Sequence, residues 1–129
     1  MTLPDKPSCC LSLVLTSEGS PEQAEALARE LVRRRLVACA SLLPVRSLYR
    51  WQGKLESSEE VKLLLKTSPE LLPALRAAIE ELHSYETPEW IQWQAASVGA
   101  YGQWFSEQLS PGDWPPTGPE SPGAGDPAG

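Results

Sequence analysis

Residues 45–67 read VRSLYRWQGKLESSEEVKLLLKT, and this stretch decides the fold class. Before Gly53-Lys54 the side chains alternate, with Tyr49 and Trp51 on one face. After this pair, aliphatic residues occupy every second position from 61 to 65. A period of two is that of a β-strand, and a Gly-containing turn between two such runs is typical of a hairpin. The stretch therefore predicts a long β-hairpin of residues 45–52 and 55–67, turning at Gly53-Lys54.

Helix signals lie on both sides of this hairpin. Ser20-Pro21 and Ser68-Pro69 each place a capping hydroxyl before a proline that suits a first helical turn. Apolar residues then recur at helical spacing. The other expected elements are strand 9–16, a helix from 20 to 35, an apolar run at 36–43 that Pro44 stops, a helix from 68 to 83, strand 89–95 with Ile91, Trp93 and Ala95 inward, and a short helix at 100–109.

This β-α-β-β-α-β order is the split βαβ arrangement, so the predicted fold class is an α+β, ferredoxin-like sandwich. Two helices cover one face of an antiparallel sheet and leave the other face open. Tyr49, Trp51 and Trp90 cannot all be hidden by two helices, and an exposed patch of this kind indicates a partner surface. The long hairpin also offers unpaired edge groups. Both features favour a homo-oligomer with closed symmetry.

Length, charge and cysteine content narrow the class of protein. The 129 residues suit one domain. A net charge of −6 without a basic stripe argues against a nucleic-acid partner. No apolar run reaches the ~18 residues of a transmembrane segment, and three Cys are too few for a disulfide scaffold. No positive stretch precedes the apolar residues 9–15, so we expect no export signal and a cytoplasmic protein.

Three segments are expected: a flexible N-terminus at 1–8, a folded domain at 9–109 and a disordered tail at 110–129. The tail holds six of the 13 Pro and five of the nine Gly, so burial cannot offset the entropy of ordering it. Trp114 is its one large apolar residue, and a docking contact through this ring is the alternative to a solvated tail.

Few residues point to chemistry. No phosphate-binding, hydrolase or zinc motif occurs, and no nucleophile–base pair is visible, which argues against an enzyme. The loop at 83–89 concentrates an imidazole, a phenol and two carboxylates. His83 suits either a helix C-cap or a ligand, and Cys39 suits either core filling or a soft-metal or redox role. Glu60 and Lys66 lie on the same face of their strand. They are either solvated charges or partners in a contact across the cleft of an oligomer.

Two motifs together resemble the CutA family of divalent-cation tolerance proteins. They are YxWxGK at 49–54 and HxYxxPE at 83–89, which are specific in order and spacing as a pair. The resemblance runs from about residue 11 to 109. Two positions depart from the family pattern: Ser84 stands where Pro is usual, and Ser41 where Asn or Thr is common.

The resemblance implies a subunit of a tight trimer, similar in architecture to PII signalling proteins, with weak binding of Cu(II) or another divalent cation and no organic cofactor. In animals, similar proteins are also tied to a partner enzyme, acetylcholinesterase. Carried over by position, the metal ligands are His83, Cys39, Glu60 and Glu89, the other cleft-lining residues are Tyr49, Trp51, Lys66 and Tyr85, and the trimer interface includes Tyr49, Trp51 and Trp90.

The leading hypothesis is a non-enzymatic trimer that binds divalent metal, Cu(II) first, and acts in tolerance of metal ions. Imidazole and carboxylate suit Cu(II), which stands highest in the divalent affinity order. The alternative is a scaffold that anchors a partner enzyme, with metal binding incidental. A PII-like nucleotide sensor is disfavoured because the chain lacks a Gly-rich phosphate loop.

Overall fold

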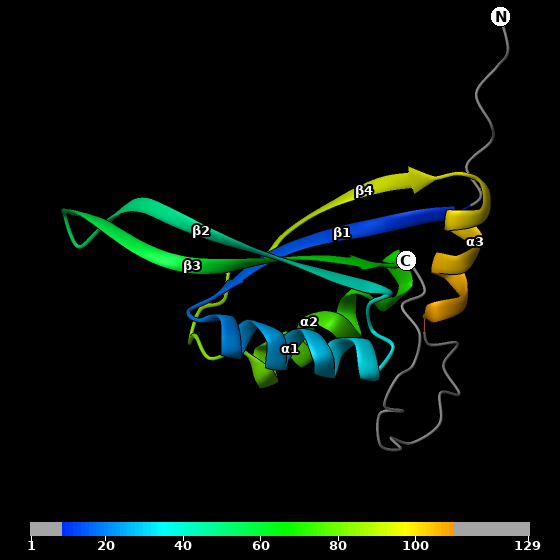
Figure 1. Cartoon of the computed structure of the whole chain (residues 1–129), viewed down its shortest axis with the longest axis horizontal. Coiled ribbons are helices and arrows are strands. Elements are labelled where there is room, and N and C mark those ends of the chain that lie inside the picture. The colour runs from blue at the N-terminus through cyan, green and yellow to red at the C-terminus, as the bar shows by residue number, and fades with distance from the viewer. Residues whose placement is uncertain (1–8, 110–129) are drawn as a thin grey trace, which may run out of the picture.

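The structure is a computed structural model that describes residues 9–109 (Figure 1). The N-terminal segment at 1–8 and the tail at 110–129, Trp114 included, lie outside the described residues. In chain order the elements are β1 (Cys9–Glu18), α1 (Pro21–Arg33), β2 (Cys39–Trp51), β3 (Lys54–Thr67), a 3-10 turn (Pro69–Leu71), α2 (Leu72–Leu82), β4 (Ile91–Ser97) and α3 (Gly99–Gln108).

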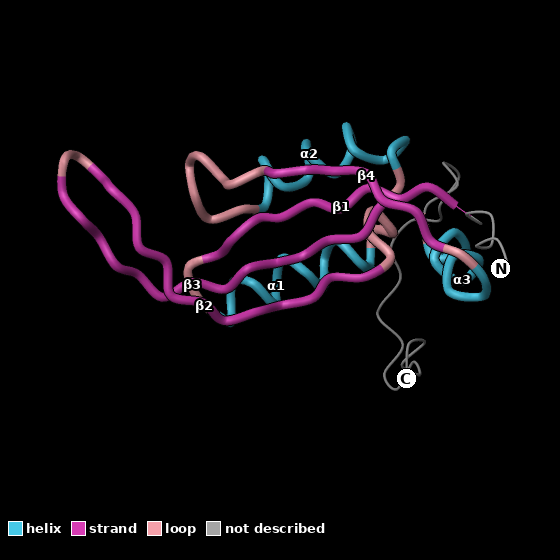
Figure 2. The backbone as a smooth tube through the Cα atoms, turned by 90° about the horizontal axis from the view of Figure 1, so that it is seen from above, coloured by secondary structure: helices cyan, strands magenta, loops and turns pink. Residues whose placement is uncertain are grey.

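The four strands form one antiparallel sheet in the order β2-β3-β1-β4. Helices α1 and α2 both lie on one face of this sheet (Figure 1). The short helix α3 lies at the end of the sheet where β1 begins and β4 ends (Figures 1 and 2). This is the ferredoxin-like arrangement that the element order predicts.

One face of the sheet is buried under α1 and α2, and we call it the dry face. We call the opposite face the open face. On the dry face Val14 of β1 and Leu63 and Leu65 of β3 are fully buried against α1 and α2. Ile91 and Trp93 of β4 point to the open face, opposite Leu15 and Leu13, and are 48% and 43% exposed. The expectation that Ile91 and Trp93 face inward is therefore wrong for a single chain. The alternation is correct, but it belongs to the face opposite α1 and α2, where α3 covers only the end near Leu11 through Phe105.

The β2–β3 hairpin extends well beyond the rest of the sheet (Figures 1 and 2). Strand β1 ends at Glu18, opposite Val61, so the outer hairpin residues 45–60 pair only with one another. The turn residues are Gln52 and Gly53, one position earlier than expected, and both have positive φ (50° and 78°). Positive φ at both central residues is typical of the type I′ turn, whose twist matches that of the strands.

Pro44 does not stop the second strand, contrary to expectation. It lies within β2 opposite Val61. Strand β2 is at the edge of the sheet, where a residue without an N–H group is tolerated because the outer side of the strand has no ladder partner. The apolar run and the Tyr/Trp run are therefore one continuous strand.

The two Ser-Pro signals have different outcomes. Ser20 caps α1 as expected, and its Oγ accepts a hydrogen bond from the Gln23 N–H at 3.2 Å. Ser68 makes no side-chain cap bond, and a 3-10 turn precedes α2. Pro73 in the first turn of α2 sets where the regular helix begins.

Candidate functional site

A hollow of about 680 Å³ lies where the hairpin leaves the body of the protein. Four predicted site residues, Tyr49, Trp51, Glu60 and Tyr85, meet there. Gly19, Ser58 and Glu59 complete its lining, and we call these seven residues the aromatic hollow. The hairpin supplies five of them, the end of β1 leads into Gly19, and the loop after α2 supplies Tyr85.

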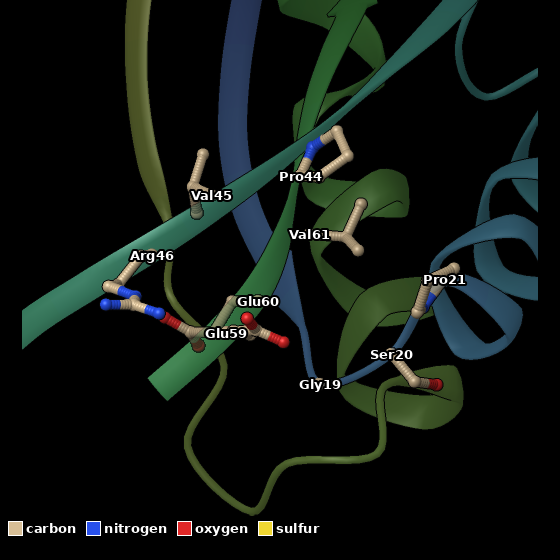
Figure 3. A pocket seen from close by; sticks show the side chains of 9 residues that line it. All are labelled: Gly19, Ser20, Pro21, Pro44, Val45, Arg46, Glu59, Glu60 and Val61. Atoms are coloured by element: carbon tan, nitrogen blue, oxygen red, sulfur yellow. The ribbon is translucent and has the colours of Figure 1, made fainter. Parts of the chain in front are cut away.

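A second hollow of about 430 Å³ adjoins the first, since both are lined by Gly19, Glu59 and Glu60. It lies between the start of α1 and the hairpin (Figure 3). Arg46 and Glu59 are cross-strand partners here, and their side chains point toward one another (Figure 3). Glu59 therefore faces a cation, whereas Glu60 turns toward the aromatic hollow.

Tyr85 is held in place at both ends. Its hydroxyl donates to Glu60 Oε2 at 3.1 Å, and its backbone N–H donates to His83 Nδ1 at 2.9 Å. Its ring lies against Gly19, where an added Cβ would come within 3.3 Å of the Tyr85 hydroxyl oxygen. Burial and the neighbouring carboxylate of Glu60 raise the pKa of Tyr85 to about 12. At neutral pH Tyr85 is therefore a neutral hydrogen-bond donor.

His83 is buried and both its ring nitrogens are engaged. It is the C-cap residue of α2, which is one of the two roles that the sequence leaves open. Because Nδ1 accepts the Tyr85 N–H, the ring proton belongs on Nε2, which donates to the carbonyl oxygen of Ser17 at 2.5 Å. In this arrangement neither nitrogen is available to a metal.

Glu18 is a buried carboxylate that the sequence analysis did not single out. It is 1% exposed, and Ser84 binds it twice: the Ser84 N–H donates to Oε2 at 3.1 Å and the Ser84 hydroxyl donates to Oε1. A proline at position 84 could supply neither donor. The alternation of β1 offers a signal for this residue, because it places Glu18 on the same face as the buried Val14 and Thr16.

Glu89 joins a polar group on the open face. Lys62 Nζ donates to Glu89 Oε1 at 3.0 Å and to Ser17 Oγ at 2.9 Å, and the Ser17 hydroxyl donates to Glu89 Oε1 at 2.8 Å. Sequence reasoning missed Lys62 and Ser17, although their position on the same face as Leu64 and Leu15 predicts partial burial. An ammonium ion bound to a carboxylate is not a base, so this group offers no activated nucleophile.

Cys39 and Lys66 lie at the opposite end of the sheet. They are cross-strand partners, and Lys66 Nζ donates to the Tyr101 hydroxyl of α3 at 2.9 Å. That hydrogen bond raises the pKa of Lys66. Lys66 is six residues along β3 from Glu60, or about 20 Å at the strand repeat. Within one chain, therefore, Lys66 and Glu60 do not meet.

The predicted metal ligands do not come together in one chain. Between residues 9 and 109, no group of three or more His, Cys, Asp and Glu side chains is close enough to hold a metal ion. Trp90 also lies apart from Tyr49 and Trp51. Its ring packs against the core under α2, 5.5 Å from the Arg76 guanidinium, and Nε1 donates to Gln92.

The antiparallel sheet backed by two helices, with an aromatic hollow at the base of a protruding hairpin, defines a ferredoxin-like α+β fold. The family model described as "CutA1 divalent ion tolerance protein" matches residues 12–108. The chain belongs to this family, as its motifs at 49–54 and 83–89 predict.

Similar proteins come from several organisms. The divalent-cation tolerance protein CutA of Pyrococcus horikoshii is 37% identical over 97 residues, 74% of this chain and 95% of that protein. The structure of CutA from Synechococcus elongatus superposes with a TM-score of 0.78 at 35% identity, covering 81% of this chain and 95% of that one. The structure described as the periplasmic divalent cation tolerance protein CutA from Archaeoglobus fulgidus has a TM-score of 0.73 at 27% identity, covering 78% and 99%.

Among the helices at residues 9–109, none is both long and apolar enough to span a membrane.

Proposed function

We propose that this protein is a non-enzymatic homotrimer that binds divalent cations, Cu(II) first, and acts in tolerance of metal ions. Support for the cation comes from the family, whose matching members carry the name divalent-cation tolerance protein. Support for the assembly comes from the open face and the protruding hairpin of this chain.

The observation that carries the proposal is the apolar surface that one chain leaves uncovered. Ile91 and Trp93 on the body and Trp51 on the hairpin, 61% exposed, all belong to the open face. A two-stranded hairpin is at best marginally stable in water on its own. Strands β2 and β4 are the two edges of the sheet, so β2 of one copy can pair with β4 of the next. A head-to-tail contact of this kind gives a ring when the rotation between copies closes, and the proposal is that it closes after three copies.

A metal site in this assembly has to combine ligands from different subunits. Cys39 and Glu60 are about 20 Å apart along one sheet, so a thiolate from one subunit would join the carboxylates of Glu60 or Glu89 of its neighbour. His83 would contribute only after Nδ1 releases the Tyr85 N–H. Thiolate and imidazole are the softer ligands that favour copper over magnesium or calcium.

Light scattering and a copper titration test the proposal. We expect a mass near three times 14.1 kDa, and copper binding that weakens at least roughly 10-fold in Cys39→Ser. Cys10→Ser is the matched control, because Cys10 is also a free thiol and is exposed. A mass of 14.1 kDa contradicts the assembly. Equal copper affinity in the two variants excludes Cys39, and equal heats for His83→Ala and the parent exclude His83.

A second candidate, a scaffold that anchors a partner enzyme such as acetylcholinesterase, is favoured by the other face of the hairpin. Leu55, 79% exposed, and Leu48 lie on the side opposite Trp51, so a trimer that covers the open face leaves them available. In this case Leu48→Asp abolishes capture of the enzyme and leaves trimer mass and copper affinity unchanged. Capture by the variant at the parental level would contradict a role for this surface.

We also propose a cytoplasmic location, supported by the free thiols of Cys10 and Cys39, which suit a reducing compartment. Fractionation of cells that produce the full chain tests this location. Recovery of the protein among the exported proteins, and not in the cytoplasmic fraction, would contradict it.

A further inference from the structure

A separate hollow of about 370 Å³ lies at the end of the sheet where α3 packs (Figure 1). We call the seven residues that line it the terminal hollow, and they are Cys10, Ser68, Glu70, Leu71, Phe105, Ser106 and Leu109. We propose that the terminal hollow holds the indole ring of Trp114, from the segment of this chain that follows Leu109.

The terminal hollow is distinct from the surfaces assigned to the trimer and to the metal. Its lining comes from the start of β1, from the segment that leads into α2, and from α3 with its C-cap. None of the seven residues belongs to the edge strands β2 and β4, to the hairpin or to the loop at 83–89. The proposal therefore uses no residue that the proposed trimer or metal site needs.

The chain leaves the described residues at the rim of this hollow. Leu109 is the last described residue, and it packs against the buried cluster of Leu11, Ala38 and Phe105. Its backbone is extended (φ −89°, ψ 158°), so α3 has ended there. Trp114 is five residues further on and reaches at most ~18 Å from this fixed point, whereas a sphere of 370 Å³ is about 9 Å across. The whole hollow is therefore within reach of the ring.

The lining suits an indole. Two leucines and Phe105, which is 1% exposed, provide apolar contacts. Ser68 and Ser106 are the hydroxyl-bearing residues of the lining, and a hydroxyl oxygen is an acceptor for the N–H that a buried indole has to pair. Within residues 110–129, Trp114 is the one large apolar side chain, so no other residue of this segment gains as much from burial.

The segment at 1–8 is the other part of this chain that begins near the hollow, because Cys10 lies close to the start of β1. Its apolar side chains include that of Leu3, which is smaller than an indole. Cys9, through which this segment joins β1, is not part of the lining, whereas Leu109 is. Aromatic rings bury the largest areas of any side chain, ~150–250 Å² each. Trp114 is therefore the favoured occupant.

Alkylation of Cys10 measures whether the hollow is covered. Cys10 is a free, exposed thiol of the lining, and Cys9→Ser with Cys39→Ser leaves it as the only thiol of the full chain. In this metal-free parent, Trp114→Ala should raise the rate of alkylation by neutral iodoacetamide roughly 3- to 10-fold. The effect is modest because the ordering of five residues offsets much of the gain from burying one ring. Trp114→Phe should keep part of the protection.

Leu3→Ala is the matched control, and it should leave the rate unchanged. Leu71→Ala removes part of the wall, so it should raise the rate in the parent and have less effect when Trp114 is already Ala, because residues in contact are not additive. Circular dichroism verifies that each variant is folded. Equal rates in Trp114→Ala and the parent, or equal effects of Leu71→Ala in both backgrounds, would overturn the proposal.

Two further outcomes assign the hollow to a different occupant and also overturn the proposal. If Leu3→Ala raises the rate and Trp114→Ala does not, the segment at 1–8 covers Cys10. If the rate in the parent rises on dilution, the tail of another copy covers it.

Discussion

The two faces of the sheet are made from the same strands but behave differently. On the dry face, Leu63 and Leu65 are fully buried under α1 and α2. On the open face, the neighbouring Leu64 is half-buried, Trp93 is exposed, and polar pairs such as Lys62–Glu89 lie between the apolar residues. The chain completes one face by itself and leaves the other to a partner or ligand. The residues proposed for function belong to the open side, where α1 and α2 leave side chains such as Trp93 and Trp51 exposed.

The largest expected effect comes from changing adjacent leucines on opposite faces. Leu63→Ala should lower the free energy of unfolding by about 3 kcal/mol, because it leaves a cavity in a closed core. Leu64→Ala, on the open face, should cost less, and its cost should depend on protein concentration because in the proposed trimer a second copy covers this face. Urea unfolding of both variants at several protein concentrations measures this. If both variants lose the same free energy of unfolding at every protein concentration, the two faces of the sheet do not differ in how they are closed.

A smaller effect compares two serine hydrogen bonds. Ser84→Ala removes a bond to the buried Glu18 carboxylate, and we expect a loss of about 1.5–3 kcal/mol, as is usual for bonds to charged groups. Ser58→Ala removes an exposed bond between two hydroxyls on the hairpin, so its cost should not exceed about 0.5 kcal/mol. Chemical denaturation of both variants gives the two values. If Ser58→Ala is the more destabilising, the loop at 83–89 is not the anchored part of the site.

The smallest effect is a pH dependence of the stability, and it comes from Tyr85, which links the loop after α2 to the hairpin through Glu60. The folded pKa of Tyr85 is raised to about 12 from an ordinary value of 10.0, so between these values the unfolded chain loses a proton that the folded protein keeps. Its contribution to stability is therefore complete below pH 10 and is lost as the pH rises toward 12. Tyr85→Phe should change the free energy of unfolding by a constant amount below pH 10. Above pH 10, the free energy of unfolding should fall less steeply with pH in the variant than in the parent. Parallel alkaline slopes in urea titrations of variant and parent would contradict this.

Local patterns predicted most of the fold. Strand alternation at Val61, Leu63 and Leu65, helical spacing in α1 and α2, and the Ser20-Pro21 start are short-range signals, and each appears as expected. The boundaries that failed depend on neighbours in space. Pro44 is tolerated because β2 is an edge strand, which no local pattern indicates.

The candidate site was predicted only in part. Tyr49, Trp51, Glu60 and Tyr85 line one hollow within a single chain, and their role in a cleft between subunits stays a prediction. Cys39 and Lys66 lie at the other end of the sheet, because strand register and not sequence motif sets their position. The hydrogen bond between His83 Nε2 and Ser17, and the hydrogen bonds from Ser84 to Glu18, each join residues 66 positions apart along the chain. Such pairs have no signature within a short window.

The sequence by itself determined the order of elements, the family, and which residue types line each strand face. These properties follow from backbone periodicity and side-chain polarity, which act over a few neighbouring residues. Only the tertiary structure decided which face of the sheet closes, because both faces of β1 and β3 carry apolar residues and the crossing helices can cover just one. It also decided that Tyr85 meets Glu60 and that His83 faces inward, since these contacts form only when β1, the hairpin and the loop after α2 pack together.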